Sequence, residues 1–149
     1  MELGCGNGRV CRYIAHETKA KSTGIELSLL QWMIAKVMAR LSLRGGSEPT
    51  KQSRARILFG DVFHHDLSSY NVVYMFLMPE TYQKIRDKLT RELPSGARVI
   101  TYVWPISGWQ ISHTDHIEGS QDLFVYEKPF RHPELDEGSR EILRSAQND

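Results

Sequence analysis

Short apolar runs alternate along the chain with longer stretches in which apolar residues recur every three or four positions. The short runs predict strands, and the longer stretches predict amphipathic helices. We expect strands at residues 1–3, 23–27, 56–59, 71–76, 97–104 and 123–127. An ordinary strand has about five or six residues, and the first run has fewer, so a truncated first strand is expected.

Three helices are expected between these strands. The first follows Gly8 and ends near Lys19, and the third begins at Pro79, a residue suited to the first helical position. The second has the clearest pattern, because Ser28 and Gln31 fit a capping box. Its wide apolar face consists of Leu30, Met33, Ile34, Val37, Met38 and Leu41.

This alternation of strands and helices indicates an α/β fold with a mainly parallel sheet and right-handed crossovers. The C-terminal strand is expected to be antiparallel. One domain of residues 1–129 accounts for the pattern, and a chain of 149 residues is long enough to bury a core. Residues 130–149 are charged and poor in core residues, so a disordered tail is expected there.

A glycine-rich loop follows the first strand, in the sequence Glu2-Leu3-Gly4-Cys5-Gly6-Asn7-Gly8. Glycine lets the backbone turn sharply and lets a ligand approach without a Cβ in the way. A strand, such a turn and a helix together hold nucleotide-like cofactors in α/β folds. The dinucleotide spacing would require a third glycine at position 9, which is Arg9, so a nicotinamide-dependent oxidoreductase is disfavoured.

Two further acids are expected at the carboxyl edge of the sheet, where ligands bind in open α/β folds. Glu26 ends the second strand, and its carboxylate could accept hydrogen bonds from both hydroxyls of a ribose. Asp61 follows the third strand. The structural alternatives are solvated strand ends for Glu2 and Glu26, and a turn for Asp61.

The spacing Glu-x-Gly-x-Gly-x-Gly resembles motif I of class I S-adenosylmethionine-dependent methyltransferases, which have a Rossmann-like fold. In that family the loop passes beneath the methionine and ribose, the leading acid faces the ammonium end, and an acid after the third strand often lies near the adenine. A carboxylate beside this sulfonium cation is electrostatically favourable. The resemblance implies S-adenosyl-L-methionine as methyl donor, held by Glu2, Gly4, Gly6, Gly8, Glu26 and Asp61.

The second half of the chain resembles the small seven-strand protein-lysine methyltransferases that act on ATP synthase subunit c and the adenine nucleotide translocase. The likeness covers roughly residues 2–128 and includes Asn71-Val72-Val73-Tyr74, Gly96-Ala97-Arg98-Val99-Ile100 and Trp104-Pro105-Ile106-Ser107-Gly108-Trp109. It implies a protein substrate and in-line methyl transfer to a deprotonated lysine amine, driven mainly by positioning. The fourth strand is not followed by an Asn-Pro-Pro-Tyr-type motif, which argues against methyltransferases that act on amides and nucleobases.

A lysine amine must lose its proton before transfer, and its free pKa is about 10.4. Apolar and aromatic walls beside a sulfonium would lower that pKa, and aromatic rings could also contact the ammonium form. Tyr74 and Phe76 could form such walls, with core packing as the alternative. Asp115 or His116 could orient or deprotonate the amine. The candidate catalytic residues are Trp104, Trp109, Asp115 and His116.

Composition narrows the class of protein. A net charge of +1 argues against a dominant nucleic-acid surface, so no nucleic-acid partner is expected. No apolar run is long enough to span a bilayer, and we expect a cytoplasmic protein without a membrane segment. Cys5 and Cys11 are interpreted as packing residues. The segments His64-His65-Asp66 and His113-Thr114-Asp115-His116 lack an established ligand spacing, so no metal site is expected.

Several alternatives stay open. The chain could be a small-molecule N-methyltransferase with the same cofactor site, or a non-catalytic remnant whose truncated first strand no longer supports the loop. The linker at residues 45–53 is locally basic, because it contains Lys51 and has Arg40, Arg44, Arg54 and Arg56 nearby. A solvated loop and a substrate-docking patch both fit that pattern.

Overall fold

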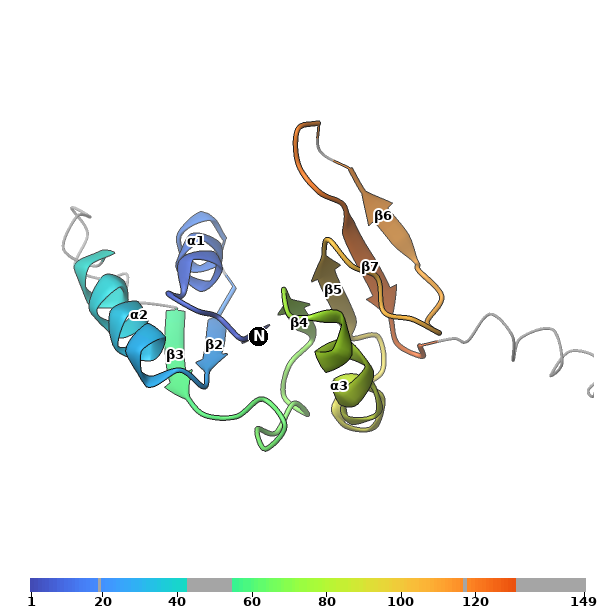
Figure 1. Cartoon of the computed structure of the whole chain (residues 1–149), viewed down its shortest axis with the longest axis horizontal. Coiled ribbons are helices and arrows are strands. Elements are labelled where there is room, and N and C mark those ends of the chain that lie inside the picture. The colour runs from blue at the N-terminus through green and yellow to red at the C-terminus, as the bar shows by residue number, and fades with distance from the viewer. Residues whose placement is uncertain (19, 43–54, 117, 131–149) are drawn as a thin grey trace, which may run out of the picture.

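A computed structural model describes residues 1–18, 20–42, 55–116 and 118–130. These residues form a seven-stranded sheet with the order β3-β2-β1-β4-β5-β7-β6 and three helices (Figure 1). The strands are β1 (Glu2–Leu3), β2 (Ser22–Glu26), β3 (Ala55–Phe59), β4 (Val72–Met75), β5 (Arg98–Tyr102), β6 (His113–Asp115) and β7 (Leu123–Glu127). The helices are α1 (Arg9–Glu17), α2 (Leu29–Ser42) and α3 (Pro79–Glu92).

The sheet confirms the expected α/β fold. Strands β3, β2, β1, β4 and β5 are parallel, and β7 runs antiparallel between β5 and β6. The chain fills the sheet outward from β1 to β3 and then crosses to β4 on the other side, so the loop after β1 lies at the topological switch point. Strand β6 was not expected, because its three residues are polar and exposed and therefore show no apolar alternation.

Helix α3 carries the buried stripe that its sequence pattern predicts. Tyr82, Ile85 and Leu89 are fully buried and belong to one core cluster with residues of β4 and β5 such as Val73 and Val99. Within the described residues, no helix is long and apolar enough to cross a membrane.

Helix α2 does not bury the wide apolar face expected from its pattern. Ala35 is the fully buried residue of α2, and it belongs to a small cluster with Ile57 of β3. Trp32 is partly buried and packs against this cluster. A Cβ added to Gly8 would lie 3.3 Å from the Ala35 Cβ, so small residues set the close approach of the helix to the glycine loop. The large apolar side chains of α2 consequently lie on its outer side.

The expected boundary between domain and tail needs a small correction. Phe130, assigned to the tail on composition, stacks on Trp109 with ring centroids 3.9 Å apart and packs against the main core. The remaining tail, residues 131–149, and the basic linker at residues 45–53 lie outside the described residues, as does Lys19.

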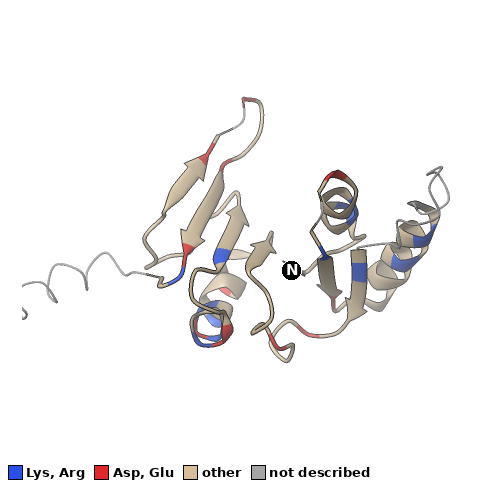
Figure 2. Cartoon of the chain, turned by 180° about the vertical axis from the view of Figure 1, so that it is seen from behind, with Lys and Arg blue, Asp and Glu red and all other residues tan. Residues whose placement is uncertain are grey.

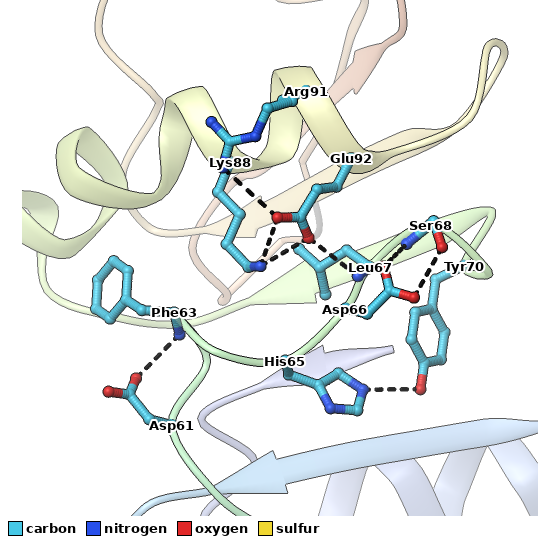
Figure 3. A network of polar contacts seen from close by, with 10 residues as sticks. All are labelled: Asp61, Phe63, His65, Asp66, Leu67, Ser68, Tyr70, Lys88, Arg91 and Glu92. Carbon is cyan, nitrogen blue, oxygen red and sulfur yellow. Dashed lines mark hydrogen bonds and ion pairs between the residues drawn. The ribbon is translucent and has the colours of Figure 1, made fainter.

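Side-chain hydrogen bonds hold the connection between β3 and β4 against α3 (Figure 3). The Glu92 carboxylate accepts from Lys88 Nζ at 2.6 Å and from the Leu67 backbone N–H at 3.2 Å. Asp66 caps the next turn by accepting from the Ser68 N–H at 2.9 Å. The hydrogen bonds from Lys88, ahead of the other contacts, lower the pKa of Glu92.

Replacing Glu92 tests whether this network fixes the connection. We expect Glu92→Gln to lower the free energy of unfolding by about 1 kcal/mol at neutral pH, a value reduced for partial exposure. Because the folded-state pKa is lowered, the stabilisation is present above the unfolded-state pKa and is lost as the pH falls through the folded-state pKa. Urea titrations of wild type and variant should therefore converge below pH 4.5, the ordinary pKa of the group.

The exposed Glu80 on the same helix offers a matched control, and Glu80→Gln should change stability little at any pH. A stability difference for Glu92→Gln that stays constant from neutral to acidic pH would contradict the assigned ion pair.

Candidate functional site

The loop after β1 depends on glycine at three positions. Gly4, Gly6 and Gly8 have φ angles of 71°, 51° and 69°, a left-handed region that other residues rarely adopt. The N–H groups of Gly4 and Cys5 both donate to the Ile25 carbonyl at 3.0 Å, which fastens the loop to β2. A Cβ on Gly6 would meet nothing within 4 Å, so this residue leaves open space for a ligand, whereas Gly8 allows close packing.

A cavity of about 220 Å³ lies between this loop and the end of β4. Its lining includes Glu2, Gly4, Gly6, Asn7, Tyr74 and Phe76. The cavity therefore combines a backbone that a ligand can approach closely, one acidic residue, one basic residue (Arg9) and two aromatic residues. It brings together Glu2, Gly4 and Gly6 among the cofactor residues expected from the sequence.

Glu2 is the buried acid of this cavity, with 8% of its surface exposed. Its Oε2 accepts hydrogen bonds from the Cys11 backbone N–H at 3.1 Å and from the Cys11 thiol at 2.9 Å. Burial raises the pKa of the Glu2 carboxyl, and the bonds from Cys11 counteract only part of that effect. A cationic ligand in the cavity would stabilise the ionised carboxylate.

Glu26 ties the glycine loop to the end of β2. Its Oε2 accepts from the Gly6 N–H at 2.7 Å, and its Oε1 accepts from the Ser28 N–H at 2.8 Å. Each carboxylate oxygen can accept more than one hydrogen bond, so these contacts leave capacity for hydroxyl groups of a ligand. Glu26 is thus fixed in place at the sheet edge where a ribose contact was expected.

Asp61 is engaged in the turn that follows β3. Its carboxylate accepts from the Phe63 N–H at 2.9 Å and pairs with His64 Nδ1 at 3.2 Å. This is the turn chemistry given as the structural alternative for this residue. Since β2 lies between β3 and β1, Asp61 is two strands away from the strand that carries Glu2.

An exposed aromatic cluster continues from the cavity along the carboxyl edge. Phe76, which is 51% exposed, stacks on Trp104 with centroids 5.9 Å apart and planes at 17°. Tyr102 meets Phe76 edge-on at 5.3 Å. Val103, between Tyr102 and Trp104, has a φ of 74°, a strained conformation for a β-branched residue. Sequence reasoning missed Tyr102, although its position in the two-residue repeat of its strand was a usable signal.

The structure does not place Trp109 in an amine pocket. Only 4% of Trp109 is exposed, and its ring packs between Phe130, at 3.9 Å, and Tyr126, at 5.6 Å. Its flanking loop residues suggested a pocket, but the ring belongs to the main core. We therefore reassign Trp109 from the amine pocket to the core, where it is a packing residue.

Asp115 and His116 are exposed at the edge strand β6 and the turn that follows it. His116 Nδ1 pairs with Asp122 Oδ1 at 2.5 Å. Three steps in the strand order separate β6 from β4, about 14 Å at the usual strand spacing. The structure therefore does not bring these two residues together with the cavity.

The two cysteines and His65 have local partners. Burial raises the pKa of Cys5 to about 12 and also raises that of Cys11, so both thiols stay protonated at neutral pH. Cys11 was interpreted only as a packing residue, and no sequence signal marked its bonds to Glu2. His65 contacts the Tyr70 hydroxyl at 3.2 Å. Among the described residues, no group of three or more His, Cys, Asp or Glu side chains could hold a metal ion.

Comparisons with known proteins show the family of this chain. The family model of the ANTKMT methyltransferase domain matches residues 2–113. A protein-lysine N-methyltransferase of Saccharolobus islandicus is 31% identical over 84% of this chain and 74% of its own length. The mouse adenine nucleotide translocase lysine N-methyltransferase is 32% identical over 74% of this chain, but the match covers only 45% of that protein.

A solved structure shares the architecture. The RNA methyltransferase from Salinibacter ruber, in complex with S-adenosyl-L-homocysteine, superposes with a TM-score of 0.75 at 25% identity. The superposition covers 85% of this chain and 77% of that one. The glycine loop, its buried acid, the strand order and the family match lead to one conclusion. The chain belongs to the ANTKMT family of S-adenosylmethionine-dependent methyltransferase domains.

Proposed function

We propose that this chain is a protein-lysine N-methyltransferase that takes its methyl group from S-adenosyl-L-methionine. The observation that carries the proposal is one cavity in which the buried Glu2 carboxylate, the glycine loop and Phe76 meet. Relatives named as protein-lysine methyltransferases support the choice of acceptor. Since the chain spans about half the length of the mouse relative, the protein substrate is part of the proposal.

The residues around the cavity fit the cofactor. Gly6 has open space where a Cβ would stand, so the backbone can approach a ligand closely. Glu2 would face the ammonium end of the cofactor, and Glu26 would accept hydrogen bonds from the ribose hydroxyls. Gly4 and Gly8 shape the loop, and Asp61 would lie toward the adenine. When bound, S-adenosyl-L-methionine supplies an electrophilic methyl group on a sulfonium centre.

The aromatic cluster would receive the lysine. Phe76 lines the cavity and stacks on Trp104 beside it, and such rings contact an ammonium group favourably. Apolar walls lower the pKa of an amine that they surround, which favours the neutral nucleophile. The chain's own contribution is then to bind, orient and desolvate the amine for in-line attack.

Asp115 and His116 remain candidates for contact with the substrate rather than with the reacting amine, because they lie at the same edge of the sheet but far from the cavity. We infer a cytoplasmic enzyme, supported by a sequence with only two cysteines, both of them free. The domain is proposed to span residues 1–129, and the adjacent Phe130 packs against its core.

The substitution Glu2→Gln tests the cofactor assignment, because it should weaken cofactor affinity and raise the stability of the fold. Calorimetry with S-adenosylhomocysteine should show affinity at least about tenfold weaker, or about 1.4 kcal/mol, because the cationic amino group loses its carboxylate. Stability should rise at neutral pH, since burial disfavours the ionised acid. Because the folded-state pKa is raised, the buried carboxyl of wild type becomes protonated as the pH falls, and its destabilising effect disappears. The free energies of unfolding of the two proteins should therefore converge as the pH approaches 4.5.

The exposed Glu17 on α1 provides the control, and Glu17→Gln should leave affinity unchanged. Unchanged affinity for Glu2→Gln, with a normally folded variant, would exclude Glu2 from the cofactor site.

Trp104 and Trp109 should respond differently to alanine. We expect Trp104→Ala to lower kcat/KM for a methyl-accepting protein by about tenfold to a hundredfold, while cofactor affinity stays within about twofold. Trp109→Ala should instead lower the free energy of unfolding by about 3 kcal/mol, because it removes a buried ring. Steady-state kinetics and thermal unfolding measure the two effects, and loss of activity without loss of stability in Trp109→Ala would overturn its assignment to the core.

Transfer of a labelled methyl group into a cell lysate tests the proposed function directly. The full chain should label a protein band that resists ribonuclease and disappears with protease, and mass spectrometry should find methyllysine. The variant Glu2→Gln/Glu26→Gln should give no label. Label that ribonuclease removes would favour an RNA acceptor, the substrate named for the Salinibacter ruber protein, and label in small molecules would favour an N-methyltransferase of metabolites.

A further inference from the structure

Helix α2 carries a continuous apolar stripe on the side away from the sheet. The stripe consists of Leu29, Leu30, Met33, Ile34, Val37 and Leu41, and we call it the α2 stripe. The exposed fractions of these side chains run from 40% for Ile34 to 62% for Leu30. At about 3.6 residues per turn they occupy roughly half of the helix circumference, opposite the side where Ala35 packs on the sheet.

The stripe continues onto the carboxyl edge of the sheet. Leu27, just before the helix, and Phe59, at the end of β3, are both more than half exposed. Helix α2 forms the outer flank of the molecule beside β3 (Figure 1). A contiguous apolar surface of this kind marks an interaction site on a globular protein.

The surroundings of the α2 stripe are basic. Lys36 and Arg40 are exposed and border it on the helix. Figure 2 shows blue segments and no red ones along α2. Helix α2 itself has two basic residues and no acid, while the whole chain is almost neutral.

A wide apolar face bordered by Lys and Arg is the pattern of a helix that lies in the interface of a membrane. Helix α2 has 14 residues, and about 20 are needed to cross the hydrocarbon core, so it would lie parallel to the surface. Anionic headgroups attract Lys and Arg beside the surface, whereas a symmetric contact between two copies would bring the like charges together.

We propose that the α2 stripe docks this protein onto an anionic lipid bilayer. The apolar side chains enter the boundary between headgroups and acyl chains, and Lys36 and Arg40 contact the headgroups. Because Leu27 and Phe59 extend the apolar surface to the carboxyl edge, docking holds the edge with the glycine loop close to the membrane. The docking surface does not depend on the identity of the methyl acceptor.

Sedimentation of the full chain with lipid vesicles tests the proposal. We expect binding to vesicles of phosphatidylcholine with phosphatidylserine that is at least tenfold tighter than binding to phosphatidylcholine alone, and that weakens with salt. The variant Met33→Glu/Val37→Glu should lose at least tenfold in partitioning. Lys36→Gln/Arg40→Gln should lose most of the salt dependence, because it removes charge and keeps the stripe.

Ile111→Glu is the matched control, because it places the same charge on an exposed apolar residue near the opposite edge of the sheet and should bind vesicles like wild type. Circular dichroism checks that all variants fold. Absence of vesicle binding by wild type, or equal binding by Met33→Glu/Val37→Glu, would overturn the proposal. A concentration-dependent dimer that this variant dissolves, without vesicle binding, would assign the stripe to a second copy of the chain and also overturn it.

Discussion

A carboxylate buried in the central strand constrains the rest of the site. Glu2 lies in a two-residue strand between two longer ones, and both of its observed hydrogen bonds, from the N–H and thiol of Cys11, go to Oε2. Burial of an ionised acid is costly unless charge or hydrogen bonds compensate it. The cavity beside Glu2 offers room for a ligand, and a positive charge placed there would offset the burial that raises the pKa of Glu2.

The aromatic end of the site depends on backbone strain. A positive φ in a β-branched residue such as Val103 costs of order 1–3 kcal/mol. The Val103 N–H donates to the Asp122 carbonyl at 3.0 Å, and Thr101 Oγ1 donates to the Trp104 carbonyl at 2.8 Å, and these bonds hold the turn. The turn sets Trp104 against Phe76 instead of continuing the strand. Strain and aromatic surface therefore coincide at one point of the carboxyl edge.

The sequence predicted the features that local chemistry determines. Glycine spacing revealed a loop with three positive φ angles, and apolar runs located every strand except β6. The same pattern showed that α2 is apolar, but it did not show which side of the helix meets the sheet. That side is determined by the contact between Ala35 and the glycine loop, which are far apart in the sequence. Trp109 was misjudged for a related reason: its neighbours in sequence suggested a loop, but Phe130 covers its ring.

Glu26 joins the two functional surfaces of the molecule. One carboxylate oxygen accepts from Gly6 in the cofactor loop, and the other accepts from Ser28 at the start of α2. The loop and the apolar helix are therefore fastened to the same side chain at the end of the same strand. A ligand hydroxyl that also donates to Glu26 therefore bonds to the side chain that positions the first turn of α2. A surface that immobilises this turn would in the same way hold Glu26 in place for the ligand. Cofactor binding and surface docking thus share one structural element, although each uses different atoms around it.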